Sequence, residues 1–299
     1  MKKISKFLIF LSLLFSGIIF LLYPSTTKKI INDLLLLWLN KVLVSLLPFY
    51  ILSSILIQYP YISKVLYRIF YKIMRFENRI ACSLFFISFI TGNPTSSILV
   101  INSVKNGEIS INEGNRLLRC TVLSSPLFTI TMCFPYGWYV LLSQMIVSVL
   151  FYILGYHKTI QGTFSNTIHK NSLFDIAEHT PALMLEILST MLIVGLLKVP
   201  FDIILNKLSL DNIIFIKYPM DMIELTTGLA NIGDYNVNSS VKLILSANLL
   251  SFGGITIIFQ IMNQLKKTSL SKTSLVMSRI LHGLCTVVIL ILMILIFKI

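Results

Sequence analysis

Charged side chains are scarce in this chain. Only 12% of its 299 residues are Asp, Glu, Lys or Arg, whereas 56% are hydrophobic, and the mean hydropathy is +0.85. Because soluble domains carry about 25% charged residues, this composition excludes a soluble domain of ordinary type. The sequence predicts an all-α polytopic membrane protein, with roughly seven to ten membrane segments in two related halves that contain broken or re-entrant helices.

Acidic residues are the rarer of the two charged groups. The chain has 12 Asp and Glu against 25 Lys and Arg, a formal net charge of +13. In a soluble protein this excess would suggest nucleic acid, but here the cations lie between apolar runs and form no basic groove interleaved with aromatic residues. We therefore expect the cations to set the topology and to contact anionic lipids at basic loops, with no nucleic-acid partner.

Cysteine and enzyme signatures are also sparse. Cys82, Cys120, Cys133 and Cys285 lie in or beside apolar segments without the spacing of a metal site, and we interpret them as buried small side chains. The chain has no His-Glu-x-x-His, Gly-x-Ser-x-Gly or Walker lysine motif. We expect no enzyme activity, cofactor or metal, while a homo-oligomer is compatible with the composition.

Apolar runs define the predicted organisation. Lysines precede the run over residues 7–23, and no small-x-small cleavage site follows, so we expect an uncleaved first helix with a cytoplasmic N-terminus. Further spans are predicted over residues 34–57, 136–156, 181–197 and 275–297. We expect an N-terminal membrane half over residues 1–156, a polar linker over 157–180 and a C-terminal half over 181–299.

Several shorter segments are predicted to lie at or within the membrane without crossing it. Residues 58–80 alternate basic and aromatic side chains, which is typical of an amphipathic interfacial segment on the cytoplasmic side. Residues 198–219 alternate apolar and charged side chains and are also expected at an interface. Residues 220–232 are too few to cross, so a re-entrant or broken element is expected there. The spacing of Ser110 and Glu113 predicts a capping box and a helix from Ile111.

Two short stretches, residues 91–97 and 251–256, interrupt apolar runs. Pro94 lacks an amide donor, and Gly253-Gly254 is unfavourable in a helix. A serine follows each glycine at the same distance, since 110 − 92 = 18 and 271 − 253 = 18, and the two units share one offset, 253 − 92 = 161. Paired interruptions of this kind indicate a transporter's central binding site. The alternative is chance self-similarity in Leu-, Ile- and Ser-rich sequence.

Small polar residues gather at and beside these interruptions. Hydroxyl groups and half-helix N-termini favour a small anionic or polar solute. Alternatively, the hydroxyls only cap broken helices, and the amides only bridge neighbouring helices. The predicted substrate-binding residues are Gly92, Asn93, Pro94, Ser96, Ser97, Ser125, Glu224, Thr226, Ser251, Gly253, Gly254, Thr256 and Gln260.

Ionisable residues expected at membrane depth form a short set. Glu224, followed by Thr226, is predicted to be functional, with a structural ion pair to Arg279 or Lys242 as the alternative. Glu186 is a weaker candidate because it could reach the interface. Arg279 and His282 share one helix face. They are candidate coupling or ion-pairing residues, with an interfacial anchor and a packing histidine as the alternatives.

The order and spacing of several motifs carry a resemblance over nearly the whole length. These motifs are Leu47-Pro48-Phe49, Gly92-Asn93-Pro94, Gly107-x-Ile109-Ser110 with Glu113 and Arg116-Leu117-Leu118, Ser125-Pro126-Leu127-Phe128, Glu224-x-Thr226-x-Gly228, Ser251-Phe252-Gly253-Gly254 with Gln260, and Arg279-x-x-His282. With them the chain resembles the sporulation integral membrane proteins of the YlbJ type, in the wider group that carries nucleoside-recognition Gate domains.

The resemblance implies a multi-pass protein of the bacterial cell membrane that moves dipicolinic acid during endospore formation. Two departures bear on the solute. This chain has Thr95-Ser96-Ser97 where the family has Gly and a basic residue, and Leu123 and Ser124 where the family has Asn and Gly. A dianion would therefore lack a cationic partner and be repelled by Glu224 unless that group is protonated or paired, which makes Glu224 a candidate coupling group. Transport of a nucleoside or other polar solute, and a non-transporting scaffold role in sporulation, are the alternatives.

Overall fold

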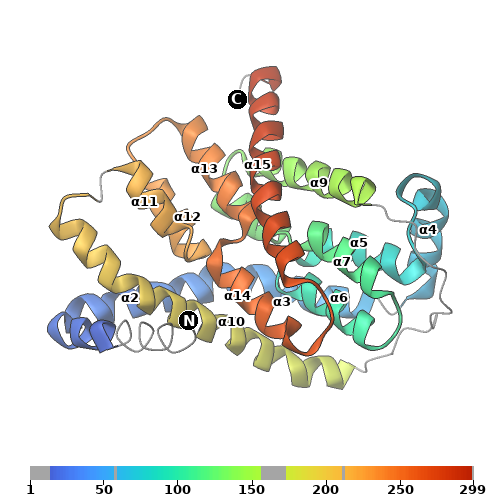
Figure 1. The fold of residues 1–299 in the computed structure, drawn as a ribbon, viewed down its shortest axis with the longest axis horizontal. Coiled ribbons are helices and arrows are strands. Elements are labelled where there is room, and N and C mark those ends of the chain that lie inside the picture. Colours follow the sequence, from blue (N-terminus) through green and yellow to red (C-terminus); the bar gives the residue numbers. More distant parts are fainter. Residues whose placement is uncertain (1–13, 57–58, 156–172, 211–212, 298–299) are drawn as a thin grey trace.

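Every regular element in the computed structural model is a helix, within the residues that it describes, which are 14–56, 59–155, 173–210 and 213–297 (Figure 1). Within these described ranges, five helical segments are long and apolar enough to cross a membrane. They are Pro24–Leu56, Gly137–Leu154, Phe174–Lys207, Ser239–Gln264 and Lys272–Phe297. The prediction of an all-α polytopic membrane protein is confirmed.

The first long segment contains a change of helix type. It consists of α2 (Pro24–Leu37), a π-helical turn η1 (Trp38–Leu43) and α3 (Val44–Leu56), and residues 14–22 before it are also helical. The predicted span over 7–23 lies partly outside the described residues. Next, α4 (Pro60–Met74) exposes Tyr61, Lys64 and Arg68, in agreement with an amphipathic segment. A π-turn changes which residues face a neighbour, and such turns are frequent at functional sites.

At four places in the described chain, two short helices follow each other directly with a brief interruption between them. They are α5 (Arg79–Thr91) with α6 (Thr95–Lys105), α7 (Ile111–Thr121) with α8 (Pro126–Met132), α11 (Ile214–Asp221) with α12 (Leu225–Gly233), and α13 (Ser239–Phe252) with α14 (Gly254–Gln264). Two of these interruptions lie in the paired stretches at residues 91–97 and 251–256. The other two lie at residues 122–125 and at residues 222–224, the latter inside the segment 220–232 where a broken or re-entrant element is expected. We call all four the helix breaks.

Local residue chemistry explains where the chain stops and restarts. Gly92 and Gly253 end their helices with positive φ angles of 67° and 90°, a conformation that glycine adopts without a steric penalty. Ser125 restarts a helix as its N-cap, accepting a hydrogen bond from the Phe128 amide, with Pro126 in the first turn. Glu224 is the N-cap of α12.

The remaining helices are α9 (Gly137–Leu154), α10 (Leu173–Lys207), the 3₁₀ turn η2 (Leu265–Lys267) and α15 (Lys272–Phe297). Helix α10 is longer at both ends than the predicted span over 181–197. It includes the last residues of the predicted linker and the first ten of the predicted interfacial segment over 198–219. It continues through Pro181 and Pro200, because a long helix can lose an internal hydrogen bond at proline without ending.

The expected capping box at Ser110 forms only in part. The Ser110 hydroxyl accepts a hydrogen bond from the Glu113 amide at 3.1 Å, so a helix begins at Ile111 as predicted. The reciprocal bond is different, because the Ser110 amide donates to Glu77 Oε2 at 3.0 Å. The Glu113 side chain instead contacts Arg116 and Tyr152.

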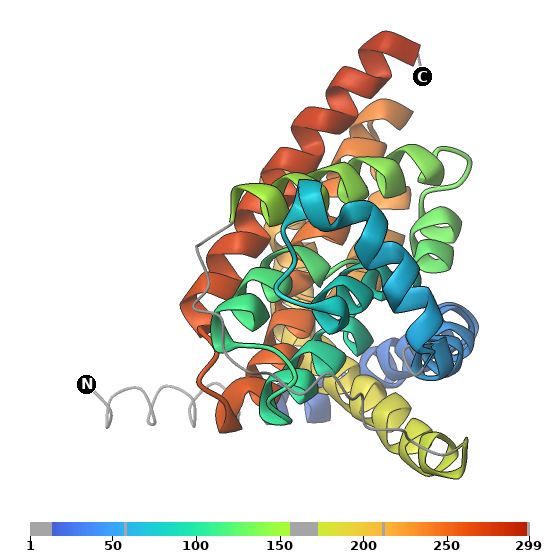
Figure 2. The same ribbon diagram turned by 90° about the vertical axis from the view of Figure 1, so that its right-hand side faces the viewer.

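Two apolar core clusters join the chain's N- and C-terminal parts. One gathers around Phe85, Leu117 and Tyr152 and includes Ile261 of α14. The other gathers around Met184 and Leu250 and includes side chains of η1, α3, α8 and α9. Helix α15 packs along α13 and α9, while α10 runs beside α2 and α3 (Figures 1 and 2). The two parts therefore share one interior.

The close approach of Gly92 to the break at 122–125 gives a first prediction. A Cβ at Gly92 would lie 2.3 Å from the Ser125 amide nitrogen, whereas one at Gly107, which has a similar φ of 69°, would meet nothing within 4 Å. Gly107→Ala therefore adds only backbone strain, roughly 1–2 kcal/mol. Gly92→Ala adds overpacking of about 1–3 kcal/mol to that strain. Thermal unfolding in detergent should show a clearly larger loss for Gly92→Ala, and equal losses would contradict this packing.

Candidate functional site

The four helix breaks meet in two pairs, each held by backbone hydrogen bonds. In the first pair, the Asn93 amide donates to the Leu123 carbonyl at 2.6 Å. In the second, the Ile255 amide donates to the Met222 carbonyl at 3.1 Å and the Thr256 amide to the Ile223 carbonyl at 3.1 Å. Backbone groups that leave a helix in an apolar environment need such partners. Each break therefore supplies hydrogen bonds to another.

A small cavity of about 50 Å³ lies where these two pairs come together, and we call it the central cavity. Its walls combine residues from η1, α3, α10 and all four breaks. Among the predicted binding residues, those that line it are Asn93, Pro94, Ser125, Glu224, Thr226, Thr256 and Gln260. The chain thus brings together, from sites far apart in sequence, polar side chains that the sequence could only place beside separate interruptions.

The wall of this cavity contains a buried polar group without a partner. Asn93 is 5% exposed, and its Oδ1 accepts a hydrogen bond from Ser97 at 2.8 Å, yet its Nδ2 has no partner among the described residues. The buried residues Thr226 and Gln260 add a hydroxyl and an amide to the wall. Leaving a buried polar group unsatisfied costs about 1–3 kcal/mol. The cavity is therefore suited to a ligand that carries hydrogen-bonding groups.

Glu224 holds the start of α12. Its Oε1 accepts a hydrogen bond from the Thr226 amide at 3.1 Å and its Oε2 one from the Thr227 amide at 2.7 Å, and the residue is 1% exposed. Such contacts stabilise a carboxylate through the positive end of the helix dipole. The ion pair given as the alternative for Glu224 does not form, since Lys242 donates to the Gly233 carbonyl and Arg279 to the carbonyls of Arg119 and Val122.

The other predicted coupling residues lie away from the central cavity. Arg279 is fully buried, and its guanidinium donates to the carbonyls of Arg119 and Val122 at the C-terminal end of α7 rather than reaching the protein surface. His282 is also buried, with its Nε2 3.0 Å from the Ser148 hydroxyl. Arg279 thus satisfies backbone groups that the break after α7 leaves free.

The remaining predicted residues support the cavity wall or lie outside it. The Ser96 hydroxyl donates to the Thr121 carbonyl at 2.8 Å. Gly92, Gly253 and Gly254 form the breaks themselves, Ser97 orients Asn93, and Ser251 accepts a bond from Gln144. Glu186 is exposed on α10 and does not line the cavity.

Gln144 is a polar residue that the sequence reasoning missed. It is fully buried in α9, where its Nε2 donates to the Ser251 hydroxyl at 3.1 Å and its Oε1 accepts from the Ser124 hydroxyl at 3.3 Å. It therefore joins one break from each part of the chain. A glutamine in the middle of the apolar run Gly137–Leu154 was the available signal.

A second missed set surrounds Asp221, and we call it the Asp221 cluster. The Asp221 Oδ1 lies 2.7 Å from Lys198 Nζ and accepts a hydrogen bond from Asn231 Nδ2 at 2.7 Å, while its Oδ2 accepts one from the Tyr235 hydroxyl at 2.6 Å. Lys198 is 4% exposed and Asp221 0%. The sequence placed Lys198 at an interface, but an aspartate beside the apolar run 220–232 was a usable signal of a buried charge.

A third buried set holds the end of α4. Arg116 donates to the carbonyls of Met74 and Arg75 at 2.8 and 3.1 Å, and its guanidinium carbon lies 3.6 Å from the centre of the Tyr152 ring. Burial raises the pKa of Glu113 above its usual value, while Arg116, 3.3 Å away, acts in the opposite direction. These contacts position α4 and α7 rather than the central cavity.

The Asp221 cluster gives a second prediction. Lys198→Met should destabilise the protein by about 3–5 kcal/mol, because it leaves the Asp221 charge buried without its cation. The double variant Lys198→Met, Asp221→Asn should lose less than the sum of the single variants, since neither charge remains. Lys207→Met, at the exposed end of the same helix, serves as the control with a change of about 0.5 kcal/mol. If unfolding in detergent showed that the double variant loses as much stability as the two single variants together, this result would contradict the ion pair.

Comparison with known proteins yields no relative. No family model, curated protein or solved structure matches the chain.

Proposed function

We propose that this protein transports a small polar organic solute across a membrane, with the central cavity as its binding site. The observation that carries the proposal is the Asn93 Nδ2 group, which is buried at the cavity wall without a partner. Broken helices that meet at one site are a recurrent way of building a transporter's binding site. The resemblance to the YlbJ-type sporulation proteins supports the same assignment and a place in the bacterial cell membrane.

The scaffold alternative has less support. A protein that only recruits partners gains nothing from buried polar groups without partners, which lower its stability. Four helix breaks around one cavity also replace regular helical hydrogen bonds with contacts between distant segments. These features favour a protein whose interior must bind a polar molecule and release it.

The charge of the solute can be argued from the cavity wall. The small organic anion that the resemblance implies, dipicolinate, would rely on positive helix ends at the breaks. The first amides of α12 already donate to Glu224, and those of α14 donate to the Met222 and Ile223 carbonyls. Among the described residues, Glu224 is the one charged residue that lines the cavity, and no lysine or arginine does. A neutral polar solute such as a nucleoside avoids this repulsion. Both solutes are therefore candidates, and the composition of the wall favours the neutral one.

Either solute requires the cavity to widen. The cavity of about 50 Å³ offers room for a few water molecules, since one water occupies about 10–15 Å³ on the same measure. An aromatic dicarboxylate or a nucleoside is several times larger than a water molecule. Binding must therefore be accompanied by displacement of one wall, which is what alternating access requires.

Uptake by the purified protein in liposomes tests the proposal. Labelled dipicolinate and uridine are offered to proteoliposomes, with empty vesicles and the variant Gly92→Leu, Gly253→Leu as controls. We expect saturable uptake of one of them, which the double variant loses because both breaks are needed. If the double variant keeps the protein's role in sporulation, that result would support the scaffold. No uptake by folded, inserted protein would exclude both solutes under the gradients used.

A matched pair on α14 tests the cavity itself. Gln260→Leu removes a cavity-lining amide, whereas Asn263→Leu changes an exposed amide nearly one turn along the same helix. We expect the first to lower uptake at limiting solute about tenfold, the effect of one lost hydrogen bond, and the second to leave uptake unchanged. Equal uptake by the two variants would contradict binding in this cavity.

Replacement of Glu224 separates the two solute classes. Glu224→Gln removes the negative charge at the wall and keeps an oxygen that can cap α12. If the solute is an anion, the KM for uptake should fall in this variant because the repulsion is gone. If the solute is neutral, the KM should stay the same or rise. An unchanged KM for dipicolinate would contradict repulsion by Glu224.

A further inference from the structure

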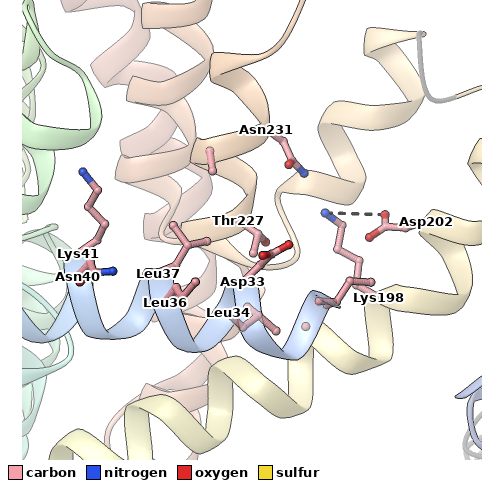
Figure 3. Close-up of a pocket in the computed structure, with 13 residues that line it drawn as sticks. Asp33, Leu34, Leu36, Leu37, Asn40, Lys41, Lys198, Asp202, Thr227 and Asn231 are labelled. Atoms are coloured by element: carbon pink, nitrogen blue, oxygen red, sulfur yellow. Dashed lines mark ion pairs between the residues drawn. The ribbon is translucent and has the colours of Figure 1, made fainter. Parts of the chain in front are cut away.

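A second and larger cavity lies beside α12 (Figure 3). Its volume is about 490 Å³, and α2, η1, α10 and α12 form its walls. We call it the outer cavity. Small-molecule sites commonly measure about 300–1,000 Å³, so this space is large enough for the solutes proposed above.

Charged residues of both signs face the outer cavity. Asp33 and Lys41 come from α2 and η1, and Lys198 and Asp202 from α10. All four lie inside segments that are apolar and long enough to cross a membrane, Pro24–Leu56 and Phe174–Lys207. Ionisable residues at such positions face a protein interior or a water-filled space rather than lipid. Their convergence on one open cavity therefore indicates that water fills it.

Helix α12 borders both cavities. Thr227, Ala230 and Asn231 line the outer cavity, while Leu225 and Thr226, at the start of the helix, line the central cavity. Ala230 lies one turn after Thr226, so the two cavities contact successive turns of α12. The π-turn η1 makes a similar division, since Lys41 lines the outer cavity and Val42 the central one.

We propose that the outer cavity is the vestibule through which the solute enters or leaves the central cavity, and that α12 is the barrier that moves. This inference rests on the proposed transport function. The Asp221 cluster holds the barrier in place, because Asn231 of α12 bonds to Asp221, which pairs with Lys198 of α10. Charges of both signs on the vestibule wall accommodate a polar solute without selecting the sign of its charge.

Cysteine accessibility on α12 tests the barrier. The background is Cys285→Ala, because Cys82, Cys120 and Cys133 are buried and Cys285 is not. Ala230→Cys then places a thiol in the vestibule and Thr226→Cys places one in the central cavity. A charged, membrane-impermeant thiosulfonate reagent is supplied on both sides of proteoliposomes that contain either variant.

We expect Ala230→Cys to be modified at least about tenfold faster than Thr226→Cys without solute, since the second thiol reacts only when α12 opens. Modification of Ala230→Cys should also abolish uptake, because the adduct fills the vestibule. A saturating solute gradient should accelerate modification of Thr226→Cys, as the barrier then opens repeatedly.

Two results would overturn the vestibule alone. In the first, the background protein takes up solute, but Ala230→Cys is modified no faster than Leu229→Cys, whose thiol would lie on a buried face of the same helix. The other is normal uptake after Ala230→Cys has been fully modified. Absence of uptake by the background protein itself would overturn the transport function and, with it, the vestibule.

Discussion

The need to satisfy backbone polar groups inside an apolar environment governs this structure. Every helix break frees amides and carbonyls that lipid cannot hydrogen-bond. The chain meets this need by crossing the breaks in pairs, as the Asn93 amide bonded to Leu123 and the Ile255 amide bonded to Met222 illustrate. Arg279 serves the same need from α15, because its guanidinium donates to carbonyls at the end of α7. The central cavity is what remains where these pairings meet.

The sequence was informative wherever a local residue decides the backbone. Gly92, Pro94 and Gly253 interrupt apolar runs visibly, and the all-α membrane class follows from composition alone. Contacts across the chain were harder to predict. The alternative for Glu224 was an ion pair with Arg279 or Lys242, whereas the residues after it offer two amides at a helix start, which are closer and cost no second buried charge. The Lys198–Asp221 pair was missed because it depends on α10 continuing beyond residue 197.

The relation between the two halves stays a prediction, but the order of the breaks bears on it. The break at Gly92 pairs with residues 122–125, which follow it, whereas the break at Gly253 pairs with residues 222–224, which precede it. The offset of 161 therefore matches the first break of one half to the second break of the other. Matching by chain order instead pairs Gly92 with the break at Glu224, and Ser125 with Gly253. Glycine therefore lies in the earlier break of the first pair and in the later break of the second pair.

Gln144 has a consequence for how tightly the interior holds a gradient. Its amide donates to Ser251 and accepts from Ser124, so one side chain spans a break from each half. A shift of either break beyond hydrogen-bond reach leaves half of this amide unsatisfied in an apolar surrounding, at a cost of about 1–3 kcal/mol. This free-energy cost therefore disfavours a state in which both sides of the cavity are open at once. In a transporter this penalty acts against leak, the simultaneous passage of water and ions that would dissipate the gradient the cell maintains.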